Sequence, residues 1–492
     1  LEVLALRLAA RSEDAELRYR ASNPELTDSP FYRLLRAVAA AAAAVRSGDH
    51  AAMALAAVVA PLGECRIAID VIRDHLARHG VSVDVVFRLD RMRQQLERIV
   101  LLTALLDPGA APLEHRRRAM DFIAALLADM RRQARVRGLI TESLAMLTRR
   151  IVASSGRAGA HYITSSGAEW RGMLVSAAGG GVITAGTAAL KIGIGALHLP
   201  LFLDWAASAL DYAGSFLLMQ GLGFTLATKQ PPVTAAAFAH AMDEGRSECN
   251  TRPLSVLSAQ IVRSQLAAVI GNLGLVVVSA WALDALWVRL RGGHLLDAAY
   301  ADHAIASFHP LASGTLFFAV VTGFALWLSS AIAGWCENLS SYHRLPEAVR
   351  QSPGLARLLG ARRAKAAGDG LAHQVSGITG NIALGVLLAT IAMFGKFTGT
   401  ALDVRHITLS TGTLTLACLA RRPDQLFGAD VAWALVGIAC IGLLNFGVGF
   451  VISLLVAMRA RGMRVRDCGW MVRGLVRDTL ADPLPFIFPV KR

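Results

Sequence analysis

The fold is decided by the stretch Met173–Ala227, which reads MLVSAAGGGVITAGTAALKIGIGALHLPLFLDWAASALDYAGSFLLMQGLGFTLA. Two apolar runs, 173–197 and 201–227, meet at the corner His198-Leu199-Pro200. Each run exceeds the roughly 20 residues that a helix needs to cross the hydrocarbon of a bilayer. The stretch therefore predicts a transmembrane helical hairpin.

The composition divides the chain at this hairpin. The 492 residues are 54% hydrophobic and only 17% charged, with a mean hydropathy of +0.47, whereas about 25% charged residues is usual for a soluble chain. Residues 1–172 hold 25 of the 50 Lys and Arg and 19 of the 36 Asp and Glu. The membrane-like average therefore comes from the residues that follow. The six cysteines include no Cys-x-x-Cys pair, so neither a disulfide framework nor a metal site is predicted, and no cofactor is expected.

The patterning predicts an all-α polytopic membrane protein in three parts. Residues 1–158 carry apolar positions at helical spacing between polar breaks, which favours an Arg-rich cytoplasmic helical bundle. Residues 159–458 form the transmembrane domain, and residues 459–492 a basic cytoplasmic tail. The six predicted spans are 173–197, 201–227, 265–288, 311–335, 378–396 and 431–458.

The segment 407–420 reads ITLSTGTLTLACLA and is too short to span as a helix. Its alternation of Thr and Leu is closer to a strand pattern. We predict a re-entrant or interfacial segment here.

The basic residues between spans predict the orientation. With a cytoplasmic N-terminus, the inner segments carry 18 Lys and Arg and the outer segments carry 5. Positive residues gather on the cytoplasmic side of membrane proteins. Both termini are therefore expected in the cytoplasm.

Three charged residues lie inside the predicted hairpin. Lys191 and Asp204 stand about seven and five residues from its corner, hence at similar depth on adjacent helices, and Asp211 lies two turns deeper. Charges within a span are costly and often functional. One interpretation is an ion or proton path, and the other is a Lys191–Asp204 pair that holds the hairpin together.

Other polar residues in the spans are candidates for interhelical contacts. Asn272, Asn381 and Asn445 are mid-span amides of the kind that hydrogen-bond between helices. The run Gln265…Asn272 resembles Gln374…Asn381, either through duplication or by chance. Asp403, Arg405 and His406 precede the Thr-rich segment and form either a site or an interfacial anchor. The run Gly179-Gly180-Gly181 lacks the Lys-Ser/Thr of a phosphate loop, so close helix packing is predicted for it.

Several motifs resemble a bacterial family, the gonococcal-type site-specific recombinases, over about residues 140–480. The stretch Ala227-Thr228-Lys229-Gln230-Pro231 is the most specific of them. The others are His161-Tyr162, Gly179-Gly180, Lys191, Gly271-Asn272, Gly380-Asn381, Asp403-Val404-Arg405-His406 and Asn445. The resemblance implies a role in DNA recombination and a bacterial inner (cytoplasmic) membrane as location.

The residues do not provide recombinase chemistry by themselves. His75–Arg78 and His115–Arg118 have the His-x-x-Arg spacing of tyrosine recombinases, but such pairs arise by chance in an Arg-rich chain. The catalytic residues, and whether the chain is an enzyme, stay open. Three functions remain: a family member that contacts DNA through residues 1–158, a transporter or channel using Lys191, Asp204 and Asp211, and a non-enzymatic membrane scaffold. The expected partners are the lipid bilayer, DNA and a second copy of the chain.

Overall fold

The computed structural model describes residues 1–20, 29–133, 147–149, 151–152, 159, 162–248, 252–400, 402–422, 425, 428–464, 466 and 469–487. The regular elements within these ranges are helices, as the sequence predicts. They form two compact units. Unit 1 comprises Leu1–Arg150 with Asn338–Leu345, and unit 2 comprises Ile151–Glu337 with Pro346–Arg492.

Unit 1 is a bundle of amphipathic helices, the longest of which has 23 residues. Its elements are α1 (Glu2–Ser12), α2 (Ala15–Arg20), α3 (Pro30–Ser47), α4 (Ala51–Ala56), α5 (Val59–His79), α6 (Val83–Leu105) and α7 (Pro112–Gln133). Leu8, Leu34, Ile72, Met92 and Leu96 are fully buried in its core. These side chains recur at three- and four-residue spacing, so each helix buries one stripe against its neighbours.

Eight residues from much later in the chain complete unit 1. Asn338 receives a hydrogen bond from the Val81 amide at 2.8 Å and donates one to the Val81 carbonyl at 3.0 Å. Gly80 beside it has φ +111°, and a Cβ there would lie 2.7 Å from the Tyr342 backbone nitrogen. Only glycine fits this turn. The sequence gives no sign that residues 338–345 belong to unit 1.

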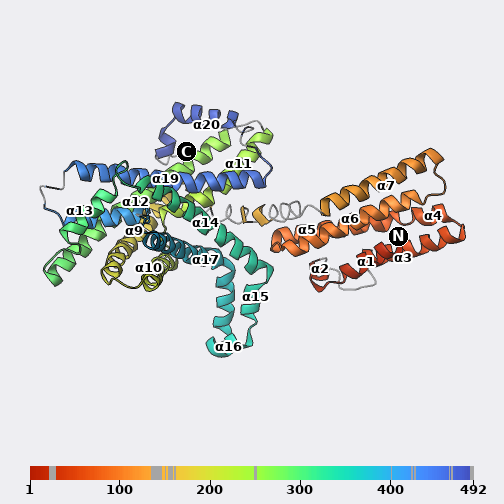
Figure 1. The fold of residues 1–492 in the computed structure, drawn as a ribbon, viewed down its shortest axis with the longest axis horizontal. Coiled ribbons are helices and arrows are strands. Elements are labelled where there is room, and N and C mark those ends of the chain that lie inside the picture. The colour runs from red at the N-terminus through yellow and green to blue at the C-terminus, as the bar shows by residue number, and fades with distance from the viewer. Residues whose placement is uncertain are drawn as a thin grey trace. The chain divides into compact units, whose positions relative to one another are not determined.

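Unit 2 contains the long helices. They are α9 (Gly167–Ala196), α10 (Leu201–Gly221), α11 (Gln230–Glu248), α12 (Arg252–Arg291), α13 (Ala298–Ser307), α14 (Thr315–Tyr342), α15 (Leu345–Arg350), α16 (Pro353–Leu359), α17 (Ala361–Thr398), α18 (Ile407–Leu419), α19 (Ala429–Ala460), α20 (Gly469–Ala481) and α21 (Leu484–Ile487), with a 3-10 turn η1 at Ala227–Lys229. Figure 1 shows α15, α16 and the first part of α17 projecting from the other helices of this unit.

Six helical stretches among the described residues are long and apolar enough to cross a membrane. Five of them, α9, α12, α14, α17 and α19, contain predicted spans. The sixth is Ala51–Leu76 of unit 1, which lies in the part of the chain predicted to form the cytoplasmic helical bundle. The predicted span 201–227 is not among the six. Its helix α10 ends at Gly221, and Asp204 and Asp211 lower its hydropathy.

Glycines allow the helices of unit 2 to pack closely in two pairs. A Cβ on Gly181 of α9 would lie 2.4 Å from the Asn272 carbonyl oxygen of α12, and one on Gly180 would lie 2.5 Å from the Thr225 oxygen. A Cβ on Gly385 of α17 would lie 2.5 Å from the Ala213 nitrogen of α10. Small residues let helix backbones approach each other in this way. The Gly179–Gly181 run thus lies at a helix contact.

The segment 407–420 is a helix, α18, and its strand-like pattern was misleading. Thr411 donates to the Ile407 carbonyl at 2.8 Å, and Thr415 donates to the Thr411 carbonyl at 2.8 Å. A threonine hydroxyl in a helix can donate its hydrogen bond to the backbone carbonyl four residues earlier in the same helix. The alternating Thr and Leu are therefore compatible with a buried helix surrounded by other helices.

Candidate functional site

A non-helical segment leads into the interior of unit 2 just before α18. Residues 402–406 are not helical, and Val404, Arg405 and His406 are buried. Asn445, fully buried in the middle of α19, holds this segment. Its Oδ1 accepts from the Ile407 amide at 3.1 Å, and its Nδ2 donates to the Arg405 carbonyl at 3.0 Å and to the Ala319 carbonyl at 3.1 Å. One amide side chain thus joins α14, α18 and α19.

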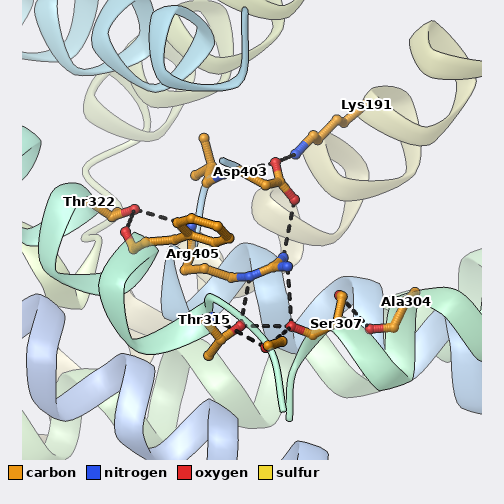
Figure 2. A network of polar contacts seen from close by, with 10 residues as sticks. Lys191, Ala304, Ser307, Thr315, Thr322, Asp403 and Arg405 are labelled. Carbon is orange, nitrogen blue, oxygen red and sulfur yellow. Dashed lines mark hydrogen bonds and ion pairs between the residues drawn. The ribbon is translucent and has the colours of Figure 1, made fainter. Parts of the chain in front are cut away.

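Asp403 on this segment lies between two cations, as Figure 2 shows. Lys191 Nζ of α9 approaches Asp403 Oδ1 at 3.4 Å, and Arg405 Nη1 donates to Asp403 Oδ2 at 3.1 Å. Lys191 and Asp403 therefore pair across 212 residues of sequence. The three side chains carry one positive charge in excess.

Arg405 also holds the end of α13. Its Nε donates to Thr315 Oγ1 at 2.9 Å and its Nη2 to the Ser307 carbonyl at 3.3 Å. The guanidinium carbon lies 4.8 Å from the centre of the Phe308 ring. The Ser307 carbonyl also accepts a hydrogen bond from Thr315 Oγ1 at 2.8 Å. Arg405 is thus held by contacts to both ends of the turn between α13 and α14 (Figure 2).

These charged groups line a cavity of about 650 Å³, here called the charged cavity. Its walls come from α9, α13, the start of α14, residues 403–405 and the first half of α18. Besides Lys191, Asp403 and Arg405 they include Tyr300, His303, Ser313 and Ser410. The volume lies in the range of small-molecule sites, and polar and apolar side chains both line the cavity.

The charges of the hairpin are paired differently from the prediction. Lys191 does not pair with Asp204. Asp204 Oδ2 instead accepts from Lys396 Nζ of α17 at 2.8 Å, because α10 packs along α17. Asp211 is buried on α10, and one of its carboxylate oxygens has no hydrogen-bond partner among the described residues.

The non-helical segment after α10 is bound by a second buried amide side chain, that of Asn272. Asn272 Oδ1 of α12 accepts from the Ala227 amide at 2.9 Å, and its Nδ2 donates to the Thr225 carbonyl at 3.0 Å and to the Ala177 carbonyl. Gln265, two turns before it, donates to the Ala227 carbonyl at 3.0 Å. The specific motif of residues 227–231 therefore begins at Ala227, where side chains of α12 hydrogen-bond the backbone.

The matching Gln and Asn of α17 hold the same region from another side. Asn381 Nδ2 donates to Gln220 Oε1 at 2.5 Å, and Gln220 Nε2 donates to Gln374 Oε1 at 3.0 Å. Gln220 is the last residue but one of α10. Both copies of the repeated Gln and Asn thus bind the segment 220–227.

Other motif residues are placed around this segment. Gln230 is buried and donates to Met173 Sδ at 3.3 Å, and Pro231 follows it in the first turn of α11. The Gly179 position lies against the Phe224 ring, and Tyr162 packs beside a small apolar cluster that includes Met173. His161 lies outside the described residues.

In the His115–Arg118 pair of unit 1, the guanidinium is engaged by protein acceptors rather than free for a phosphate. Arg118 donates to Asp107 at 3.1 Å, to Glu114 at 2.5 Å and to the Ala104 carbonyl at 2.5 Å. Its hydrogen bond holds the pKa of Asp107 below the usual value. His75 stacks on His79, with ring centres 4.0 Å apart, and the side chain of Arg78 lies outside the described residues. Within the described part of the chain, no group of three or more His, Cys, Asp or Glu is arranged to hold a metal ion.

Sequence reasoning found the charged residues of the cavity but missed those that position them. Ser307 and Thr315 bind the Arg405 guanidinium, yet each is a common residue near a helix end. Nothing in their local pattern marks them, because their partners are distant in sequence.

The comparisons with known proteins assign the chain to a class. A family described as site-specific recombinase matches residues 1–489, and the chain belongs to this family. The match includes unit 1 as well as the region with the recognisable motifs. Neither the curated proteins nor the solved structures gave a match.

Proposed function

We propose that this member of the site-specific recombinase family is a multi-pass membrane protein that binds a small anionic solute in the charged cavity. The observation that carries the proposal is the chain Lys191–Asp403–Arg405, in which Arg405 is buried and the other two are partly buried, among helices long enough to cross a bilayer. Ionisable groups within such helices are expensive, so those that are present commonly mark a substrate or ion site.

The chemistry of the cavity favours an anion. Its two cations exceed its one carboxylate, and Lys191 and Arg405 have more N–H donors than the Asp403, Thr315 and Ser307 contacts use. A carboxylate or phosphate group would accept from the remaining donors and balance the charge. Phe308, Phe318 and Tyr300 would border the apolar part of an organic acid.

The irregular backbone supports a membrane solute site as well. Non-helical segments at membrane depth are tolerated where they are buried in protein or line a cavity. Val404, Arg405 and His406 of this segment are buried, and residues 403–405 line the charged cavity. Alternating access or channel activity through this site belongs to the same proposal.

The test uses the full chain in lipid nanodiscs and a panel of small organic and inorganic anions. Binding is measured by isothermal titration calorimetry for the wild type and for Lys191→Met. Losing one charge-assisted hydrogen bond, worth about 1.5–3 kcal/mol, should weaken the affinity by about tenfold or more.

Lys396→Met is the matched control, since it removes a lysine from another Lys–Asp pair, one outside the cavity lining. It should bind like the wild type. The proposal fails if no anion binds, or if Lys191→Met binds as tightly as the control.

We further propose the topology read from the sequence: six spans at 173–197, 201–227, 265–288, 311–335, 378–396 and 431–458, with both termini in the cytoplasm of a bacterial cell. The helices α9, α12, α14, α17 and α19 support five of these spans. For 201–227 the support is α10, which at 21 residues is long enough for one crossing.

A second candidate function is association with DNA through unit 1, which the family description favours. Many arginines of unit 1 are engaged in ion pairs, among them Arg33 with Glu64, Arg46 with Glu2 and Arg88 with Asp14 and Asp84. A phosphate backbone would have to compete with these carboxylates.

DNA binding is tested with the full chain in nanodiscs and a labelled duplex over a range of salt concentrations. Phosphate contacts predict an affinity that falls steeply with salt. If the full chain does not bind the duplex even at low salt, the second function is excluded, whereas the proposed solute site in the charged cavity is not affected by that result.

A further inference from the structure

Asp211 of α10 is a buried carboxylate without a cation beside it. Three acidic residues are buried in the described part of the chain, namely Asp204, Asp211 and Asp284. Asp204 pairs with Lys396 at 2.8 Å, and Asp284 pairs with His294 at 2.8 Å. Among the described residues, no cation lies within 4.0 Å of the Asp211 carboxylate, and its Oδ2 has no hydrogen-bond partner. A buried carboxylate without such contacts is costly to keep ionised.

A contact between α9 and α10 places Asp211 beside Lys191. Thr187 Oγ1 of α9 donates to Ser215 Oγ of α10 at 2.7 Å. Lys191 lies one turn after Thr187, and Asp211 lies one turn before Ser215. The two helices run antiparallel on either side of the corner at 198–200, so both steps lead toward that corner and place the two residues opposite each other. The ammonium group itself contacts Asp403 Oδ1 at 3.4 Å. Asp211 is thus a second carboxylate near the lysine of the charged cavity, although it does not line the cavity.

The net charge beside the cavity depends on the protonation of Asp211. Lys191 and Arg405 carry two positive charges, and Asp403 carries one negative charge. With Asp211 ionised, the four groups sum to zero, whereas one positive charge remains when Asp211 is protonated. Solvent screens charges in apolar surroundings only weakly, so this difference acts on an anion in the cavity. A proton on Asp211 and an anion in the cavity therefore favour each other's binding.

Few other titratable groups face Asp211. Its neighbour Tyr212 is fully buried in a cluster that includes apolar residues of α14, α17 and α18. Residues 315–335, 374–395 and 407–417 of these helices contain no titratable side chain. The remaining groups nearby are Lys191 of α9, Lys229 of η1 over the Phe216 ring at 5.8 Å, and Asp403, Arg405 and His406 before α18. His303 lines the cavity and can itself bind a proton. The experiment has to separate His303 from Asp211.

We propose that Asp211 is a proton-binding site and that its proton binds together with the anion of the charged cavity. This coupling rests on the solute site proposed above. Protonation forms an O–H bond at the Asp211 carboxylate with a proton taken from bulk water. The anion then balances the charge that remains on Lys191 and Arg405. The proton and the anion are neutral in total, so burying both is less costly than burying the anion alone.

The first experiment follows the proton in the absence of any anion. Infrared difference spectra of the full chain in nanodiscs, recorded as the pH is lowered, should contain a C=O band of a buried, protonated carboxylic acid. Asp211→Asn should lack this band. Asp204→Asn is the matched control on the same helix, and it should retain the band because Asp204 is paired with Lys396. A spectrum of Asp211→Asn equal to that of the wild type overturns the proton site and leaves the solute site unaffected.

The second experiment measures the coupling by isothermal titration calorimetry at several pH values. Nitrate and methanesulfonate are the probes, since both stay ionised throughout. The wild-type affinity should rise as the pH falls, by up to about tenfold per pH unit, the limit for one coupled proton. Asp211→Asn fixes the neutral form and should bind tightly at every pH, whereas Asp204→Asn should follow the wild type.

Three results contradict the coupling. A pH dependence that survives in Asp211→Asn but disappears in His303→Gln assigns the proton to the cavity itself. A wild-type affinity that does not change with pH overturns the coupling and leaves the solute site intact. If neither anion binds at any pH, the coupling fails together with its solute site, and the infrared band still decides whether Asp211 binds a proton.

Discussion

Replacing Asn445 by leucine should destabilise unit 2 strongly. Leucine has a similar size but cannot form the three hydrogen bonds of the amide to Ile407, Arg405 and Ala319. Interhelical hydrogen bonds in membranes contribute about 0.6 kcal/mol on average and up to about 1.7 kcal/mol. Asn445 is fully buried, so water cannot replace it, and we expect a loss of about 2–5 kcal/mol for three bonds.

The free energy of unfolding is measured by titrating the protein from mild detergent into denaturing detergent. Hydrogen exchange provides a local measurement, because the amide of Ile407 loses its acceptor and should exchange faster. Gly447→Ala is the matched control on the same helix, since a Cβ at Gly447 meets nothing within 4 Å. A loss below about 0.5 kcal/mol for Asn445→Leu, no greater than that of the control, would refute the assigned role.

Three further predictions concern packing, pH and topology. Gly181→Ala should cost about 1–3 kcal/mol by overpacking the contact of α9 with α12, whereas Gly186→Ala, with open space, should be neutral in the same detergent titration. The Arg118 contact lowers the folded-state pKa of Asp107. The stabilisation from this contact is therefore present above the unfolded pKa of about 3.9 and is lost as the pH falls through the folded-state pKa. Hydrogen exchange in the turn 106–111 should accelerate as the pH falls through that range, and Asp107→Asn should remove this pH dependence. A reporter enzyme fused after Trp287 should be inactive in the cytoplasm and one at the C-terminus active, and cytoplasmic activity at the first position would contradict the proposed topology.

The long helices could be predicted because their signal is local. Length and hydropathy decide whether a helix can cross a bilayer, and both are read from consecutive residues. The same reasoning misplaced the end of α10, because residues 222–226 are apolar enough to continue a span. They leave the helix between two points held by neighbouring helices, since Asn381 of α17 binds Gln220 and Asn272 of α12 binds Thr225 and Ala227.

The charged cavity could be predicted only in part. Lys191, Asp403 and Arg405 stood out because charges are rare in apolar runs. Their pairing could not be read from spacing, since Lys191 had a nearer candidate in Asp204 and its actual partner enters through a non-helical segment. Thr315 gave no signal at all, because a buried hydroxyl at a helix start looks like an ordinary cap.

The late segment Asn338–Leu345 makes the completion of unit 1 depend on a part of the chain that is synthesised much later. Unit 1 begins with the first residue, but the partner of its Val81 turn is synthesised some 257 residues later. Four predicted spans, 173–197, 201–227, 265–288 and 311–335, precede this segment in the chain. The Val81 turn of the early bundle can therefore gain its Asn338 hydrogen bonds only after residue 338 has been synthesised. A fragment ending near residue 158 would lack this final piece.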